Sequence, residues 1–132
     1  MRTTGTFTHD GHQLAYDVVG DGERTVVLTH GLLLSRKMHR PLSRRLAERG
    51  YRAVSLDFLG HGESDRPTEM TAYSMRGYGR QILALLDFLE VEQGIVAGTS
   101  LGANSALEAA VMAPDRFRGL VIEMPVLDNA ML

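Results

Sequence analysis

The chain has 132 residues, of which 44% are hydrophobic and 23% are charged, and its formal net charge is −2. These values are typical of one soluble globular domain with a buried core, and they exclude a strongly basic nucleic-acid-binding protein. The chain contains no cysteine, which excludes disulfides, thiolate metal ligands and cysteine nucleophiles. Neither a secretory signal nor an apolar run of about 20 residues is present, so we expect a cytoplasmic protein without a membrane span.

Short apolar runs alternate with longer helical patterns along the chain. The predicted strands cover residues 6–9, 12–19, 25–30, 51–58, 95–98 and 119–124, and the predicted helices cover residues 40–49, 74–89 and 101–112. A turn at Asp10-Gly11 joins the first two strands. The alternation predicts a mainly parallel sheet with helices on both faces, whose reactive groups lie beyond the carboxyl ends of the strands.

Two of the predicted helices have amphipathic patterns. In the helix 40–49 we expect Leu42, Leu46 and Ala47 to face the core, and Gly50 to end the helix. The inward stripe of the helix 74–89 is Met75, Tyr78, Ile82, Leu85, Leu86 and Leu89. The basic residues of this region, which we interpret as a solvated face, are Arg36, Lys37, Arg40, Arg44 and Arg45.

The run Gly98-Thr99-Ser100-Leu101-Gly102 joins the predicted strand 95–98 to the helix that follows it. A serine on such a short turn is held in strained backbone geometry, with its hydroxyl clear of the sheet and the positive end of the helix dipole beneath it. Larger side chains at Gly98, Gly102 or Ala103 would collide with the neighbouring strand and helix. The arrangement is a nucleophile elbow, and we predict Ser100 as a nucleophile.

His30, Gly31 and Leu32 follow the buried strand 25–30 and emerge at the same edge of the sheet as Ser100. The backbone amides of Leu32 and Leu101 would together form an oxyanion hole. We interpret the His30 side chain as structural, ordering its own loop. Asp57 and His61 also receive structural interpretations. Asp57 ends its strand with local hydrogen bonds, His61 braces the glycine-containing loop that follows, and no metal site is predicted.

Three segments resemble the α/β-hydrolase superfamily: LTHGLLLS at 28–35, LDFLGHGESDRP at 56–67, and GTSLGANSALEAAVMAPDRFRGLVI at 98–122. The resemblance implies a mostly parallel sheet of eight strands in the complete enzyme and a Ser–acid–His triad in that chain order. A serine at position 100 argues against the halide- and epoxide-opening relatives, whose nucleophile is a carboxylate. It favours hydrolysis of an ester or related acyl bond, without a cofactor.

All five histidines precede Ser100, so the triad base is missing from this sequence. Asp128, after the last predicted strand, is a candidate for the acid, with a turn or helix-cap role as the alternative. We therefore expect residues 1–132 to be the N-terminal part of a single α/β-hydrolase domain, truncated after about six strands, with the lid and last strands absent. The chain alone should be inactive.

The expected function of the complete enzyme is that of a serine hydrolase acting on a small-molecule acyl substrate. Expected protein partners are a second copy of the chain or the remaining C-terminal part of the same enzyme. Two alternatives stay open: a non-catalytic ligand-binding module on the same scaffold, and an acyltransferase, which would use the same residues.

Overall fold

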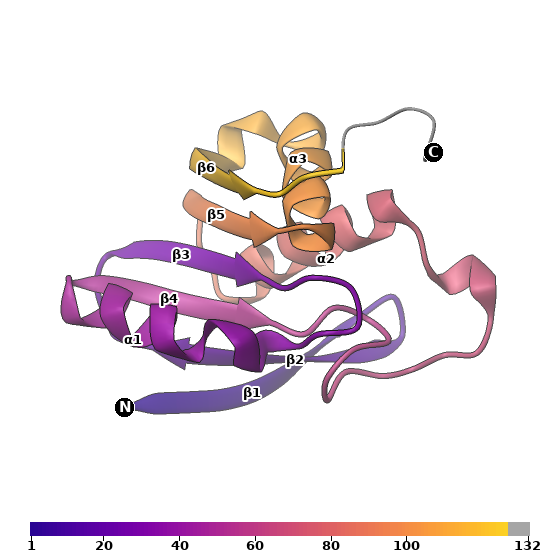
Figure 1. Ribbon diagram of the computed structural model, residues 1–132, viewed down its shortest axis with the longest axis horizontal. Coiled ribbons are helices and arrows are strands. Elements are labelled where there is room, and N and C mark those ends of the chain that lie inside the picture. The colour runs from indigo at the N-terminus through magenta and orange to yellow at the C-terminus, as the bar shows by residue number, and fades with distance from the viewer. Residues whose placement is uncertain (127–132) are drawn as a thin grey trace.

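The computed structural model describes residues 1–126 and contains one six-stranded sheet (Figure 1). The strands are β1 (Arg2–His9), β2 (His12–Val19), β3 (Arg24–Thr29), β4 (Tyr51–Leu56), β5 (Gly94–Thr99) and β6 (Phe117–Glu123). The helices are α1 (Arg40–Glu48), α2 (Met75–Phe88) and α3 (Leu101–Met112), and three short 3₁₀ turns are η1 (Arg36–His39), η2 (Met70–Ala72) and η3 (Pro114–Arg116).

The strand order is β1-β2-β4-β3-β5-β6. The hairpin of β1 and β2 is antiparallel and pairs antiparallel with β4, whereas β4, β3, β5 and β6 run parallel to one another. Each parallel crossover contains a helix, as parallel connections require. The predicted α/β class with a mostly parallel sheet is confirmed. The carboxyl ends of β3, β5 and β6 lie side by side, so the loops that follow them meet at one edge.

The helices cover both faces of the sheet, with α1 on one face and α2 and α3 on the other (Figure 1). Alternation along β3 explains this division, because Val26 and Leu28 pack in the cluster that contains Leu46 of α1. Val27 faces the opposite way, into the larger cluster that contains Ile82 of α2 and Ala106 of α3. The central strands β3 and β4 are therefore buried on both faces, as their apolar runs predict, whereas the edge strand β6 is largely exposed.

Element boundaries differ from the sequence prediction mainly at strand ends. Strand β1 begins at Arg2 rather than at Thr6, because its pairing with β2 continues as far as Arg2 opposite Val19. The predicted turn is present, with Asp10 and Gly11 both at positive φ, 49° and 79°. A two-residue turn of this kind matches the right-handed twist of a hairpin.

The prediction that Leu42 faces the core is wrong. Leu42 is 44% exposed, and of the α1 residues only Ser43 is fully buried. Leu42 instead borders a hollow of about 150 Å³ whose lining includes Ala97 and Val121 of the sheet. In α2 the predicted stripe is buried at Tyr78, Ile82, Leu85 and Leu86, whereas Met75 in the first turn is 37% exposed.

Among residues 1–126, none of the helices combines the length and the apolar character that a membrane crossing requires.

Candidate active site

Ser100 lies between β5 and α3 with φ 55° and ψ −112°, a conformation that residues other than glycine rarely adopt. Its amide donates a hydrogen bond of 2.9 Å to the Glu123 carbonyl of β6, and its own carbonyl accepts one of 3.1 Å from the Asn104 amide in α3. Backbone bonds on both sides therefore hold the strained turn. Such strain is concentrated at functional sites, where the surrounding structure maintains it.

Small residues surround Ser100 because backbone approaches it closely on both sides. A β-carbon at Gly98 would lie 2.6 Å from the Ala103 nitrogen, and one at Gly102 would lie 2.7 Å from the Thr29 hydroxyl oxygen. Ala103 itself is completely buried. The predicted need for small side chains at these three positions agrees with the structure. The strand β3 and the first turn of α3 are in direct contact here.

The loop after β3 brings Leu32 to the same edge. A turn closed by the Leu34 amide donating to the Gly31 carbonyl, at 3.1 Å, carries Leu32 at its second position. A β-carbon at Gly31 would lie 3.7 Å from the Ser100 β-carbon, which is ordinary contact, so the turn packs directly beside the serine. Within residues 1–126, the amides of Leu32 and Leu101 donate no hydrogen bond. Both donors stay unused.

His30 is fully buried and holds the loop, as the sequence predicts. Its Nε2 accepts a hydrogen bond of 3.1 Å from the Phe58 amide, which assigns the proton to Nδ1, 2.8 Å from the Gly31 carbonyl oxygen. Burial lowers the pKa of His30 from 6.5 to about 4, although the bond to Gly31 opposes the shift. Because both ring nitrogens are engaged with backbone groups, neither is available to take a proton from Ser100.

His61 also supports a loop. Its Nδ1 donates to the Leu59 carbonyl oxygen at 3.0 Å, and its ring lies 4.9 Å from that of His30, centroid to centroid. The Nε2 atom is buried and has no partner within the described residues. The bracing role predicted for His61 therefore agrees with its contacts.

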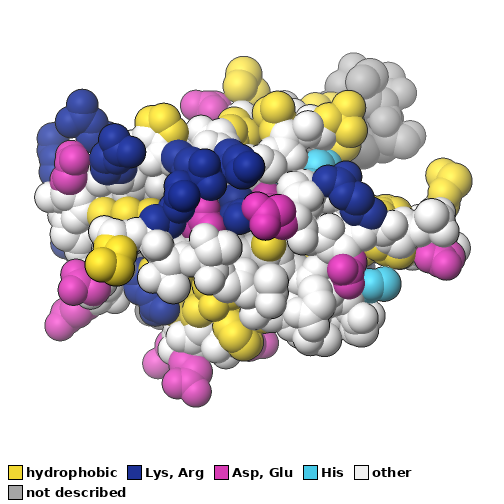
Figure 2. Space-filling model, turned by 90° about the horizontal axis from the view of Figure 1, so that it is seen from below, with side chains coloured by type: hydrophobic (Ala, Val, Ile, Leu, Met, Phe, Trp, Pro, Cys, Tyr) yellow, Lys and Arg dark blue, Asp and Glu magenta, His cyan; other side chains and the backbone are white. Residues whose placement is uncertain are grey.

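The prediction that Arg36 belongs to a solvated basic face is wrong. Arg36 is only 2% exposed, and its guanidinium bonds to Asp17 at 3.0 Å, to Glu63 at 3.0 Å and to Asp57. Burial by itself lowers the pKa of Arg36, but the hydrogen bond to Asp17 and the charge of Asp57 raise it above its ordinary value. The exposed members of the basic group are Lys37, Arg44 and Arg45. In Figure 2 basic side chains lie next to acidic ones, so no wholly positive surface forms on the face shown.

Asp57 is the centre of this buried cluster, which is more than the local strand-end role predicted for it. Besides the Arg36 guanidinium, its carboxylate accepts bonds from the amides of Arg36, at 2.6 Å, and Glu63, at 2.9 Å. A β-carbon at Gly62 would collide with the same carboxylate. The loop after β3 and the loop after β4 are thus joined through one pair of charged side chains. Arg36 and its partners lie about 20 or more positions apart, so no local sequence pattern pairs them.

Two members of a triad are not placed by the structure. Asp128, the candidate acid, lies outside the described residues. Within residues 1–126, Ser100 Oγ forms no hydrogen bond, and no group of three metal-ligating side chains occurs. The remaining histidines are His9 and His12 at the first hairpin and His39 in η1, and burial lowers the pKa of His39.

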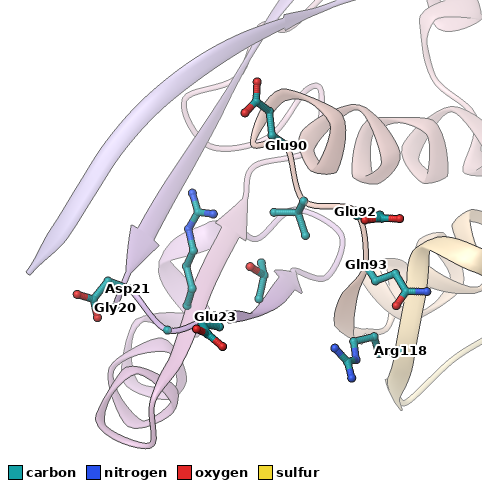
Figure 3. A pocket seen from close by; sticks show the side chains of 11 residues that line it. Gly20, Asp21, Glu23, Glu90, Glu92, Gln93 and Arg118 are labelled. Atoms are coloured by element: carbon teal, nitrogen blue, oxygen red, sulfur yellow. The ribbon is translucent and has the colours of Figure 1, made fainter.

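One hollow in the described structure, shown in Figure 3, has a lining that does not include Ser100. It has a volume of about 660 Å³ and is bordered by Thr25, Arg52, Gln93 and Arg118, at or beside the amino ends of parallel strands. These ends are opposite to the edge that carries Ser100. Reactive groups in parallel sheets gather at the carboxyl ends, so we assign this hollow no catalytic role.

The comparison with known proteins agrees with the geometry. The family described as alpha/beta hydrolase fold matches residues 24–132. The chain is 37% identical over 114 residues to a protein named putative non-heme haloperoxidase from Mycobacterium phage D29, covering 86% of the chain and 40% of the relative. It is 32% identical over 95 residues to an epoxide hydrolase from Caballeronia sordidicola, covering 72% of the chain and 29% of the relative.

Among solved structures, the chain resembles the thioesterase domain from the curacin biosynthetic pathway with a TM-score of 0.86 and 26% identity. That match covers 99% of the chain and 50% of the thioesterase domain. The chain thus spans between about a third and a half of the length of these proteins.

Proposed function

Because the chain belongs to the α/β-hydrolase fold family, we propose that it is the N-terminal part of a serine hydrolase that cleaves a carboxylic ester or related acyl bond. The observation that carries the proposal is the position of Ser100, on a strained turn at the carboxyl edge of the sheet. Residues 1–132 supply the nucleophile and the oxyanion donors of one catalytic domain. The base comes from sequence that follows position 132, and the acid is Asp128 or a later residue.

In the proposed reaction Ser100 Oγ attacks the acyl carbon while a histidine takes the hydroxyl proton. The carbonyl electron pair moves onto oxygen, where the free amides of Leu32 and Leu101 stabilise it. A single donor of this kind contributes about 3–4 kcal/mol to stabilisation of the transition state. When the tetrahedral intermediate collapses, the leaving group departs with the proton, and water then cleaves the acyl-enzyme by the reverse path.

The identity of residue 100 separates this proposal from the activity named in the epoxide hydrolase relative. Halide- and epoxide-opening members of the family are expected to use a carboxylate nucleophile, and serine occupies the corresponding turn here. A serine alkoxide forms an ester intermediate with an acyl group and not with an epoxide. The match to a thioesterase domain does not decide between acyl and epoxide chemistry, because a solved epoxide hydrolase matches the chain with the same 26% identity. The proposal of acyl chemistry therefore rests on Ser100.

Labelling by a fluorophosphonate probe tests the proposal on the protein produced from its complete reading frame. We expect one labelled site, lost in Ser100→Ala and retained in the matched control Ser105→Ala. Ser105 lies in α3, which begins directly after Ser100, but it is fully buried and its hydroxyl donates to the Leu101 carbonyl at 2.7 Å. A folded protein whose Ser100 stays unlabelled would refute the proposal and favour a ligand-binding module.

The chain of residues 1–132 alone should show negligible ester turnover, because a serine without its base loses several orders of magnitude in rate. Turnover by this chain that disappears in Ser100→Ala would contradict the proposal that the base for Ser100 lies after position 132. It would show that one of the upstream histidines reaches the serine.

A further inference from the structure

Residues in left-handed backbone conformation gather around Ser100. Among residues 1–126, five residues other than glycine have positive φ: Asp10, Leu33, Glu90, Ser100 and Met124. Asp10 belongs to a hairpin turn, and Glu90 to the turn that ends α2. The other three follow β3, β5 and β6, which are neighbours in the sheet. A large apolar residue thus stands at a strained position on each side of the serine.

Leu33 occupies a turn position that normally requires glycine. The Gly31 carbonyl accepts from the Leu34 amide, and Leu33, with φ 63°, is the third residue of that turn, where a type II turn favours glycine or asparagine. Its side chain is 86% exposed, so packing within the described residues does not offset the strain. The turn packs against Ser100 at its first residue, because a β-carbon built on Gly31 would lie 3.7 Å from the Ser100 β-carbon. Leu33 stands two residues further along this turn.

Met124 is the second large apolar residue at positive φ, and it lies on the other side of Ser100, after β6. It has φ 52° and is 67% exposed, and it follows Glu123, whose carbonyl accepts the Ser100 amide at 2.9 Å. The Asn104 side chain in α3 donates to the Val126 carbonyl at 2.8 Å and accepts from the Val126 amide at 2.9 Å. Two bonds therefore fix the segment of Met124 to the first turn of the helix that Ser100 begins.

Resting on the proposed function, we propose that Leu33 and Met124 are the specificity-determining residues of this site and bind the hydrocarbon part of the substrate. The substrates are uncharged esters or thioesters of aliphatic acids, which an apolar side chain on each side of the reacting carbonyl would bind. The adjacent Leu32 and Leu34, 61% and 51% exposed, extend the same apolar surface. Leu33 and Met124 are large and apolar at positions where glycine would be free of strain. Binding of the apolar part of the substrate would explain this choice of residues.

A series of p-nitrophenyl esters from acetate to octanoate tests the inference on the protein from the complete reading frame. We expect kcat/KM to rise by up to about fourfold for each methylene that is buried. In Leu33→Gly and Met124→Gly, the ratio of octanoate to acetate activity should fall about tenfold or more. The thermal midpoints of these two variants should not fall. Glycine adopts positive φ without strain, and this relief of strain offsets the extra entropy that glycine gives to the unfolded chain.

Glu90→Gly is the matched control, because Glu90 has φ 57° at the end of α2 and lies on the opposite edge of the sheet from Ser100. It should leave the chain-length ratio unchanged. If Ser100 is labelled and esters are cleaved while both glycine variants keep the wild-type ratio, the inference is overturned and the proposed function stands. A ratio that changes only together with a shift from dimer to monomer in sedimentation would overturn it too, because the residues would then form an interface.

Binding measured without turnover keeps the inference testable if Ser100 proves unreactive. In Ser100→Ala, methyl octanoate should shift the methyl resonances of Leu33 and Met124 in an NMR titration, and methyl acetate should not. Equal shifts with both esters, or none with either, would overturn the inference independently of the proposed reaction.

Discussion

Replacing Arg36 by methionine is expected to lower the free energy of unfolding by about 3 kcal/mol. Methionine fills much of the same volume but removes the cation from a cluster in which Asp57 is fully buried and Asp17 is 2% exposed. Removing one partner of a buried ion pair costs about 3–5 kcal/mol, because it leaves an uncompensated charge. A typical domain has only about 5–15 kcal/mol in total, so the loss is large.

Asp57 and Asp17 keep other contacts in Arg36→Met, and these place the expected loss at the lower end of the range of about 3–5 kcal/mol. Asp57 keeps two amide donors, from residue 36 and from Glu63, and Asp17 keeps the Thr4 hydroxyl at 2.8 Å. Arg2 lies 4.0 Å from Asp17 and is half exposed, so it compensates that charge only weakly. The Glu63 side chain is 63% exposed and adds less than about 1 kcal/mol to the loss.

Urea unfolding followed by far-UV circular dichroism at pH 7 measures the change. The control is Arg45→Met, whose side chain is 83% exposed and pairs only with Glu48 at 3.7 Å, so its effect should stay within about 0.5 kcal/mol. Adding Asp57→Asn to Arg36→Met should restore part of the loss, because it removes the unpaired charge. A change below about 1 kcal/mol in Arg36→Met, with an unchanged m-value, would refute the reasoning.

Two further predictions concern the elbow and His30. Gly102→Ala should destabilise the protein by about 2–3 kcal/mol in urea unfolding, because its β-carbon meets the backbone of Thr29, whereas Gly119→Ala, with open space around it, should change stability by less than about 1 kcal/mol. His30 titrates near 4 when folded and near 6.5 when unfolded, so the unfolded chain binds more protons between these values. The His30 contribution to stability should be complete above pH 6.5 and decline by about 3 kcal/mol as pH falls through 4. A stability profile that stays flat from pH 7 to pH 5, or an NMR titration of His30 with its midpoint near 6.5, would contradict this.

The sequence predicts the fold and the surroundings of Ser100 because the signals for both are local. Strand and helix periods extend over a few residues, and the restriction to small side chains at Gly98, Gly102 and Ala103 lies within three positions of the serine. The core position predicted for Leu42 is wrong for a different reason. Periodicity identifies the apolar side of a helix, but it does not say how far the neighbouring layer extends over the sheet.

The role of Arg36 has no local signal, and this explains why an arginine in a basic group was assigned to the surface. Its partners Asp17, Asp57 and Glu63 lie 19, 21 and 27 positions away, on β2 and on the loop after β4. Only the antiparallel pairing of β2 with β4 brings Asp17 and Asp57 to one side chain. The Arg36 amide and guanidinium together fix the end of the loop that begins at Gly31. The position of the Leu32 amide beside Ser100 therefore depends on a charge cluster beneath the neighbouring strands as well as on the elbow itself.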